Sequence, residues 1–302
     1  PNTFNILELW KKYTDYKKSI IEETTISIKY ASVQRYLTRM PDHKLDAPKI
    51  REYLLNNYSQ AMAWNIISSL KSCCKWAVES EMLAVNPFEK CFIKKPKCKS
   101  NQEHYKAFAK EHRDLIIEAF ELHEHHSHYA PLVKFLFWTG CRLGEAFALT
   151  WNDISDDCLK ISITKSCNFK RIRKGTKNGK RRTFPVGKDT KLHNLLLNIK
   201  TDSSTGLIFT SFKGCPMTST TLNNCWNRKG ANARLGVVAE MVRDGTIPYY
   251  LKPYATRHTF ATWAIASGIS PDRVAYWIGD DVATVLKYYC HPETTVSDCP
   301  DF

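Results

Sequence analysis

The sequence predicts a mainly α-helical protein with a small β-hairpin, an α+β fold divided into two domains. Helical periodicity runs through residues 5–88 with few strand signals, and the second half adds one pair of alternating segments to a series of helices. The chain has 302 residues, more than a single hydrophobic core usually serves. Its hydrophobic residues, 43% of the total, are sufficient to fill two cores.

The first half is predicted to form four helices, at residues 5–19, 25–38, 46–57 and 58–80. The fourth has the clearest pattern, because its apolar residues recur at steps of three and four and form one buried stripe. Pro87 ends this region, since a proline disfavours helical backbone at the residue before it. The stripe comprises Ala63, Ile66, Ile67, Leu70, Cys74 and Ala77.

A basic linker is predicted to separate the two domains. Residues 94–100 are rich in lysine, contain Pro96 and have few apolar side chains, which is typical of an interdomain segment. We therefore expect a helical domain at 1–93, a linker at 94–105 and a second domain at 106–302.

The second domain mixes helices with a hairpin. Alternation at 159–164 predicts a strand, and 182–186 predicts the strand that returns beside it. Gly140 permits a tight turn just before a helix that begins near Arg142. The other helices are expected at 107–123, 129–139, 189–199, 218–233, 256–267, 271–278 and 282–290.

The chain is strongly basic, with 44 Lys and Arg residues against 30 Asp and Glu residues and a formal net charge of +14. Basic surfaces gain affinity for nucleic acid by releasing the counterions condensed on it, so we expect a nucleic acid partner.

The eleven cysteines have no paired spacing that would suit zinc, and their odd number favours reduced thiols in a reducing compartment. No stretch approaches the roughly 20 apolar residues of a membrane span, and no signal peptide opens the chain. We therefore predict a cytoplasmic protein with no membrane association and no metal site. The histidine run is assigned to a solvated loop; it comprises His123, His125, His126 and His128.

Two arginine-containing strings and a late tyrosine pair suggest a pocket for one phosphodiester. Arg142 lies in Thr-Gly-Cys-Arg-Leu-Gly-Glu, Arg257 lies in Tyr-Ala-Thr-Arg-His-Thr-Phe-Ala-Thr, and Lys-Tyr-Tyr-Cys-His-Pro follows at 287–292. Without a metal, attack on a phosphodiester needs cationic donors for its oxygens, a nucleophile and an acid. Guanidinium suits the first task, because its planar fork donates two bonds and stays protonated.

These strings resemble the tyrosine recombinase, or phage integrase, family over nearly the whole chain. The resemblance implies a helical core-binding domain followed by a tyrosine-recombinase catalytic domain. It also implies that Arg142 and Arg257 are the two catalytic arginines and that Glu145 helps to orient the pocket. Lys177 falls where the family keeps the lysine that protonates the leaving 5′ oxygen.

The segment around Lys177 holds nine basic residues and no acidic one between Lys165 and Arg182. Lys174 and Lys180 are therefore alternatives for the acid, and a solvated hairpin that only touches phosphates is a further interpretation. The residues expected to contact DNA are Lys165, Lys170, Arg171, Arg173, Lys174, Lys180, Arg181 and Arg182.

Tyr289 is the predicted nucleophile, with Tyr288 as the alternative. In the family that the chain resembles, the nucleophile is followed two residues later by a histidine, and here His291 follows Tyr289 at that spacing. The family's nucleophile also lies nine residues after the preceding motif position, which is Asp280 in this chain. Tyr288 is then expected to serve in packing.

The chain departs from the family pattern at two positions. Tyr254 stands where the family most often has histidine, and a phenol can still donate to a phosphate oxygen. Asp280 stands where the family often has histidine or tryptophan, and an ionised carboxylate would repel a phosphate. We expect Asp280 or Asp281 to cap the helix that carries Tyr289 instead. His258, next to Arg257, is expected to point to another face of the helix, which favours a structural role that supports the site over a role in catalysis.

The resemblance implies a prokaryotic or phage-encoded site-specific DNA recombinase. It would work through a 3′-phosphotyrosine without ATP, metal or other cofactor, and would assemble as a tetramer on its duplex recombination site, with accessory bending or directionality proteins as further partners. Two alternatives stay open. One is a degenerate integrase that binds a specific site without cutting it, and the other is a type IB topoisomerase-like enzyme that rejoins the same strand.

Overall fold

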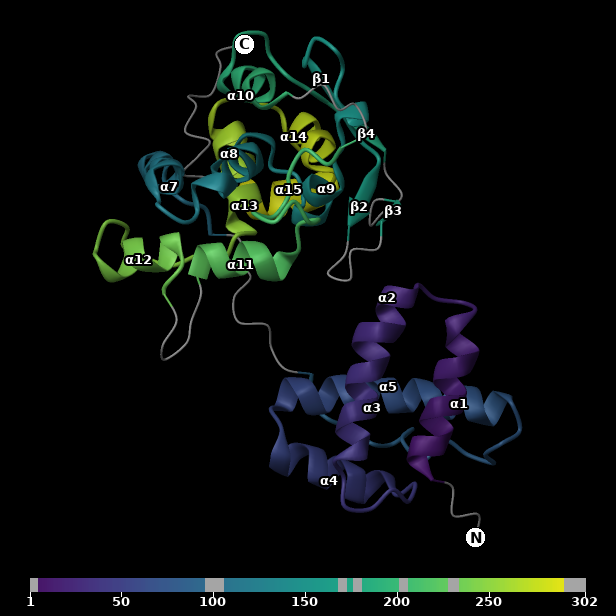
Figure 1. Cartoon of the computed structure of the whole chain (residues 1–302). Helices are drawn as coiled ribbons and strands as arrows, with labels where there is room; N and C mark the ends of the chain where they lie inside the picture. The colour runs from purple at the N-terminus through teal and green to yellow at the C-terminus, as the bar shows by residue number, and fades with distance from the viewer. Residues whose placement is uncertain are drawn as a thin grey trace, which may run out of the picture. The chain divides into compact units, whose positions relative to one another are not determined.

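The computed structural model describes residues 5–95, 106–167, 173–175, 181–200, 206–227 and 234–290. The chain divides into two compact units, Pro1–Lys99 and Ser100–Phe302 (Figure 1). Each unit has its own hydrophobic core. Most of the predicted linker, from 96 to 105, lies outside the described residues.

In the described residues, the N-terminal unit consists of helical elements and one isolated antiparallel bridge between Asn5 and Lys44. Its elements are α1 (Ile6–Lys18), α2 (Glu23–Thr25), a π-helical turn (Ile26–Tyr30), α3 (Ala31–Thr38), α4 (Ala47–Asn57) and α5 (Gln60–Glu79). The helix predicted at 25–38 is therefore continuous but irregular. Asn5, Asp46 and Ser59 cap α1, α4 and α5, since each side chain accepts a backbone N–H of the first helical turn.

The core of this unit forms along α5. All six residues of the predicted apolar stripe are buried, and α1 and α4 pack against this helix. Trp10 and Tyr13 of α1 add an aromatic cluster with Tyr30, whose ring centroid lies 5.1 Å from that of Trp10. The predicted periodicity is thus confirmed by burial.

The C-terminal unit is built mainly from helices. They are α7 (Lys110–Leu122), α8 (Ala130–Thr139), α9 (Leu143–Ala148), α10 (Lys191–Ile199), α11 (Ser219–Asn227), α12 (Val237–Arg243), α13 (Ala255–Ala266), α14 (Pro271–Ile278) and α15 (Val282–Tyr289). Short 3₁₀ turns lie at Ser127–Tyr129 and Trp151–Asp153. Among the helices that the structure describes, none is both long enough and apolar enough to cross a bilayer.

Two small antiparallel ladders accompany these helices. Strand β1 (Lys160–Ile163) pairs with β4 (Arg182–Pro185), with Lys160 opposite Pro185. Strand β2 (Lys165–Cys167) pairs with β3 (Arg173–Gly175). The predicted strand and its return are confirmed, whereas the β2–β3 ladder and α12 were not predicted. The mainly α fold with a small β component is confirmed.

Helix α13 lies at the centre of the elements that build the candidate site. Helices α8, α14 and α15 pack against it, and Figure 1 shows them gathered around it. The segment that leads into the unit is also fixed to α13: the backbone N–H of Phe108 donates to Thr259 Oγ1 at 3.0 Å, and Trp263 Nε1 donates to the Phe108 carbonyl at 2.9 Å. Phe108 itself is buried.

Gly140 ends α8 and allows α13 to approach. Its φ is +60°, a left-handed conformation that suits a helix C-terminus and that side chains rarely adopt. A Cβ at this position would lie 2.5 Å from Cδ1 of Phe260 on α13. The turn before Arg142 therefore requires glycine for its conformation and for its packing.

We predict that Gly140→Ala lowers the free energy of unfolding by about 2–4 kcal/mol, because backbone strain of about 1 kcal/mol adds to overpacking of about 1–3 kcal/mol. Gly214→Ala is the matched control, since Gly214 has φ +72° and nothing lies within 4 Å of the position that its Cβ would take. Chemical denaturation should show a distinctly larger loss for Gly140→Ala. Equal losses would contradict the packing contribution.

Candidate active site

The site begins at the N-terminus of α9, where Arg142 is the cap residue and Glu145 closes the first turn. The backbone N–H of Arg142 donates to Oε2 of Glu145 at 2.9 Å, and its Nη1 donates to Oε1 at 3.1 Å. Glu145 is only 1% exposed. Burial alone would raise the pKa of Glu145, but the hydrogen bond and charge of Arg182, with those of Arg142, outweigh burial and hold that pKa below its ordinary value.

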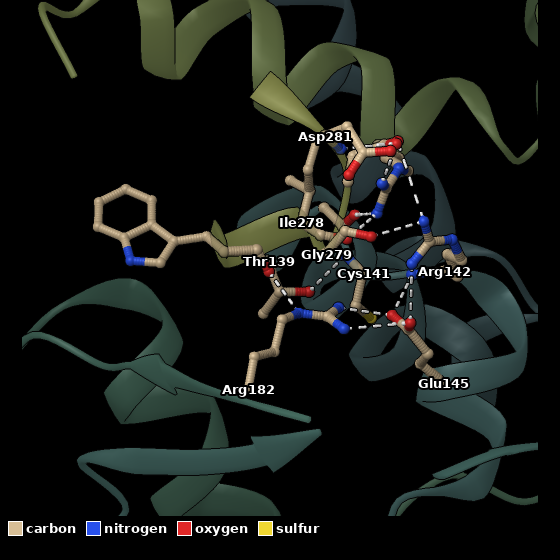
Figure 2. A network of polar contacts seen from close by, with 12 residues as sticks. Thr139, Cys141, Arg142, Glu145, Arg182, Ile278, Gly279 and Asp281 are labelled. Carbon is tan, nitrogen blue, oxygen red and sulfur yellow. Dashed lines mark hydrogen bonds and ion pairs between the residues drawn. The ribbon is translucent and has the colours of Figure 1, made fainter. Parts of the chain in front are cut away.

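Arg182 is the second partner of Glu145. Its Nη2 lies 2.6 Å from Oε2 and its Nη1 lies 3.1 Å from Oε1, while its Nε donates to the Trp277 carbonyl at 2.8 Å. Figure 2 shows Glu145 between the guanidinium groups of Arg142 and Arg182. Arg182 is 4% exposed, so the expectation that it contacts DNA is wrong. It shares the inward face of β4 with Phe184, because alternate strand residues point the same way.

Arg257 lies on the first turn of α13 and is 1% exposed. Its Nη1 donates to the carbonyls of Gly140, at 3.0 Å, and Ile278. These carbonyls stand at the C-terminal ends of α8 and α14, where the helix dipole places partial negative charge. Nη2 of Arg257 donates to Asp280, whereas its Nε is buried without a hydrogen-bond partner.

Asp280 joins the two predicted catalytic arginines. Its Oδ2 lies 2.8 Å from Nη2 of Arg257 and 3.9 Å from Nη2 of Arg142. Of the two residues expected to cap α15, Asp281 occupies the N-cap position but makes no side-chain cap hydrogen bond there, and Asp280 binds the arginines instead. Burial works to raise the pKa of Asp280, but the hydrogen bond and charge of Arg257, aided by Arg142, hold that pKa below its ordinary value.

Tyr289 is buried at the end of α15, with 1% of its surface exposed. Its hydroxyl lies 2.7 Å from Nδ1 of His258. His258 lies on a different face of α13 from Arg257, as the sequence predicts, since successive helical residues diverge by about 100°. It nevertheless contacts the predicted nucleophile.

The other two candidate tyrosines are more accessible. Tyr254, the N-cap residue of α13, is 41% exposed, and its ring lies edge-on to His258 at 5.2 Å. Tyr288 is half-buried in the small cluster that α13, α14 and α15 form, with Nζ of Lys287 5.1 Å from its ring centre. Exposure alone therefore does not select Tyr289 over Tyr288.

The other basic candidates fall around strands β2, β3 and β4. Lys177, Lys170, Arg171 and Lys180 lie outside the described residues. Arg173 and Lys174 lie in β3, where the structure describes their backbone. Arg181 is exposed. Nζ of Lys165 forms an ion pair with Oδ2 of Asp153 at 2.7 Å and donates a hydrogen bond to Oγ1 of Thr150 at 3.0 Å.

Within the described ranges, no group of three or more His, Cys, Asp or Glu side chains could hold a metal ion. Cys141, next to Arg142, is buried, and burial together with the charge of Glu145 raises the pKa of its thiol to about 12. The described side chains around Asp280 and Tyr289 provide arginine, histidine, carboxylate and phenol groups.

The sequence of the C-terminal unit matches a family of known proteins. The sequence pattern of the phage integrase family matches residues 106–295, more than half of the chain. The chain belongs to the phage integrase family. As a member of this family it is a tyrosine-type site-specific DNA recombinase, an enzyme that transfers DNA strands, as the motifs predicted.

Relatives of this integrase extend over both of its units. The tyrosine recombinase XerC of Pediococcus pentosaceus is 22% identical over 306 residues, which cover 95% of this chain and 93% of that protein. The Tn1549 transposon integrase in complex with a circular intermediate DNA has a TM-score of 0.73 and 16% identity, and the match covers 96% of each chain. A lambda integrase dimer bound to a COC′ core site has a TM-score of 0.68 and 17% identity, covering 99% of this chain and 81% of that one.

Sequence reasoning missed the groups that hold the arginines. The carbonyls of Gly140, Ile278 and Gly279 accept hydrogen bonds from the two catalytic candidates, with Gly279 O only 2.6 Å from Nη2 of Arg142. A glycine directly after each helix was the available signal, because a left-handed glycine ends a helix and turns its last carbonyls toward other donors. For Arg182, the signal was its two-residue spacing from Phe184.

We predict that Glu145→Gln reduces the free energy of unfolding by about 3 kcal/mol at pH 7, because it removes the counter-charge of the buried Arg182 and the nearer of the two carboxylates that face Arg142. The folded-state pKa of Glu145 lies below its unfolded value, so its stabilisation is complete above the ordinary glutamate pKa, about 4.3, and is lost as pH falls through the lower folded-state value.

The difference between wild type and Glu145→Gln should therefore shrink on acidification below about pH 4. Denaturation curves collected from pH 7 to pH 3 measure it. Glu118→Gln, on the exposed side of α7, serves as the control and should change stability little at any pH. A difference that stays constant over this range would contradict the role of the Glu145 charge.

Proposed function

We propose that this recombinase cleaves and rejoins duplex DNA through a phosphate ester on Tyr289. The phenol oxygen attacks the scissile phosphorus, the bond from phosphorus to the 5′ oxygen breaks, and a 3′-phosphotyrosine and a free 5′ hydroxyl result. His258 is in place to take the phenolic proton, since its Nδ1 accepts from Tyr289 in the tautomer that carries its proton on Nε2. Reversal with the 5′ hydroxyl of another duplex completes strand exchange.

The observation that supports this proposal best is the convergence of two guanidinium groups on one anion. Nη2 of Arg257 and Nη2 of Arg142 lie 2.8 and 3.9 Å from the same carboxylate oxygen of Asp280. An anion therefore fits between them, and a phosphate in this position would receive fixed positive donors as charge develops in the transition state. Tyr254 is exposed beside His258 and is proposed to donate a further hydrogen bond.

Lys177 is proposed as the acid that protonates the leaving 5′ oxygen, with Lys174 and Lys180 as the alternatives. The segment between β3 and β4 carries it, and β4 is fixed to the site through the ion pair of Arg182 with Glu145. The exposed Arg181 and the other basic residues of this region are proposed to contact the DNA backbone.

The partner is proposed to be a double-stranded recombination site, held by the N-terminal unit as a core-binding domain and by the catalytic unit. Solved structures with this fold include a lambda integrase tetramer bound to a Holliday junction, with a TM-score of 0.68 and 17% identity. By analogy we propose that the chain assembles as a tetramer on DNA. Accessory bending or directionality proteins are proposed as further partners.

A second function, site-specific binding without cleavage, is favoured by one observation: Asp280 places negative charge where a phosphate would bind. A carboxylate at about 4 Å from a phosphate is repulsive by about 4 kcal/mol at an effective dielectric constant of 20. Sequence-specific retention of a duplex with no covalent adduct on any substrate would support this alternative.

We predict that wild-type protein forms a denaturation-resistant covalent adduct with a nicked suicide duplex of the cognate site, and that Tyr289→Phe forms none. Gel electrophoresis after denaturation measures the adduct. Tyr288→Phe is the matched control and should retain it, since Tyr288 is proposed to serve in packing. An adduct that persists in Tyr289→Phe but disappears in Tyr288→Phe would assign the chemistry to the neighbouring residue.

We predict that Arg257→Ala slows adduct formation by about 10²–10³-fold, the effect of removing a preorganised transition-state donor, while duplex binding changes much less. Rapid-quench cleavage and fluorescence anisotropy separate the two effects. Arg243→Ala is the control, because Arg243 on α12 pairs with Asp244 at the surface. Cleavage by Arg257→Ala at the wild-type rate would refute the proposed pocket.

A further inference from the structure

The carboxylate of Asp280 binds Arg257 through only one of its two oxygens. Its Oδ2 accepts from Nη2 of Arg257, while its Oδ1 accepts the backbone N–H of Asp281 at 3.1 Å. Only one of its two oxygens therefore faces the guanidinium group. The second oxygen is committed to the local backbone.

The remaining donors of Arg257 indicate what a better ligand would look like. A guanidinium group presents its N–H donors in a fixed planar fork. Nη1 is used by the carbonyls of Gly140 and Ile278, and Nε is buried with no hydrogen-bond partner. Nε and Nη2 form the edge that grips a phosphate or carboxylate with two parallel bonds. Asp280 engages half of this edge, and a second anionic oxygen would satisfy the other half.

We propose that Asp280 is an internal substitute for the scissile phosphate, and that the DNA phosphate displaces it from the arginine pair. The proposal rests on the function proposed above and adds a competition between two anions for the same donors. A phosphodiester has two unesterified oxygens and can engage both Nε and Nη2 of Arg257. Asp280 must move away when it does, because both groups are negative and cannot share the site.

This displacement also acts on the candidate nucleophile. The same two arginines hold the turn between α14 and α15: Nη2 of Arg142 donates to the Gly279 carbonyl at 2.6 Å, and Nη1 of Arg257 donates to the Ile278 carbonyl. Helix α15 begins two residues after Asp280 and carries Tyr289, which is covered in the structure. When phosphate displaces Asp280 from Arg257, the turn loses one of its contacts and α15 becomes more mobile. Phosphate binding therefore exposes the hydroxyl of Tyr289.

The test compares Asp280→Asn with Asp281→Asn, which removes the same formal charge from the exposed neighbour. Inorganic phosphate is the probe, with affinity measured by calorimetry and mobility by amide hydrogen exchange over residues 281–289. We expect Asp280→Asn to bind phosphate roughly tenfold more tightly than wild type, within the range typical of coupled sites. Its exchange should be faster without phosphate, and phosphate should raise exchange in the wild type. Asp281→Asn should match wild type in both measurements.

Equal phosphate affinity in Asp280→Asn and Asp281→Asn would overturn the proposal. Asp280→Ser is measured as a second variant, and thermal melting of both variants shows whether a folding defect is specific to asparagine. Loss of the fold in both Asp280 variants would overturn it too, because a group that DNA displaces cannot be one on which the fold depends.

The outcomes also separate this proposal from the proposed function, since neither measurement requires cleavage. Tighter phosphate binding by Asp280→Asn, combined with no covalent adduct from any variant, would refute the recombination chemistry and leave the displacement standing. Adduct formation by wild type, combined with identical behaviour of Asp280→Asn and Asp281→Asn, would support the recombination chemistry and refute the displacement of Asp280.

Discussion

A guanidinium group can be buried only where carbonyls or carboxylates satisfy its donors, and this requirement organises the C-terminal unit. Arg257 and Arg182 are both almost fully buried, and each is held by groups from segments far apart in sequence. Glu145 supplies the one fully buried carboxylate of this network among the residues described. Removing it would leave the buried Arg182 without its counter-charge and next to the partly buried Arg142. The same carboxylate therefore affects both the geometry of the pocket and the stability of the unit.

The helix ends provide the remaining partners. Helices α8 and α14 both finish at a glycine in the left-handed conformation, Gly140 and Gly279, and both direct terminal carbonyls at arginine donors. At Gly279 a Cβ would lie 2.5 Å from Nη1 of Arg182 and 3.2 Å from Nη1 of Arg142. A side chain at this position would therefore displace both guanidinium groups. Gly279 thus determines both the backbone conformation at the end of α14 and the positions of the two guanidinium groups beside it.

Much of this arrangement could be predicted from the sequence, because it depends on local patterns. Apolar periodicity located the α5 core, alternation located β1 and β4, and the two arginine strings identified the family. The partner of each charge could not be predicted, because pairing depends on which segments meet in space. Arg182 looked like one of many surface cations, and Asp280 looked like a helix cap. The adjacency of His258 and Tyr289, 31 residues apart, likewise follows from the packing of α15 on α13.

The attachment of Phe108 to α13 has a mechanical consequence. Both backbone groups of this residue are bonded to side chains of the helix that bears Arg257 and His258, through Thr259 and Trp263. Because both bonds are made to α13, Phe108 and this helix can move apart only if the two bonds break together. A displacement of the backbone at Phe108 is therefore passed to the helix that carries Arg257 and His258.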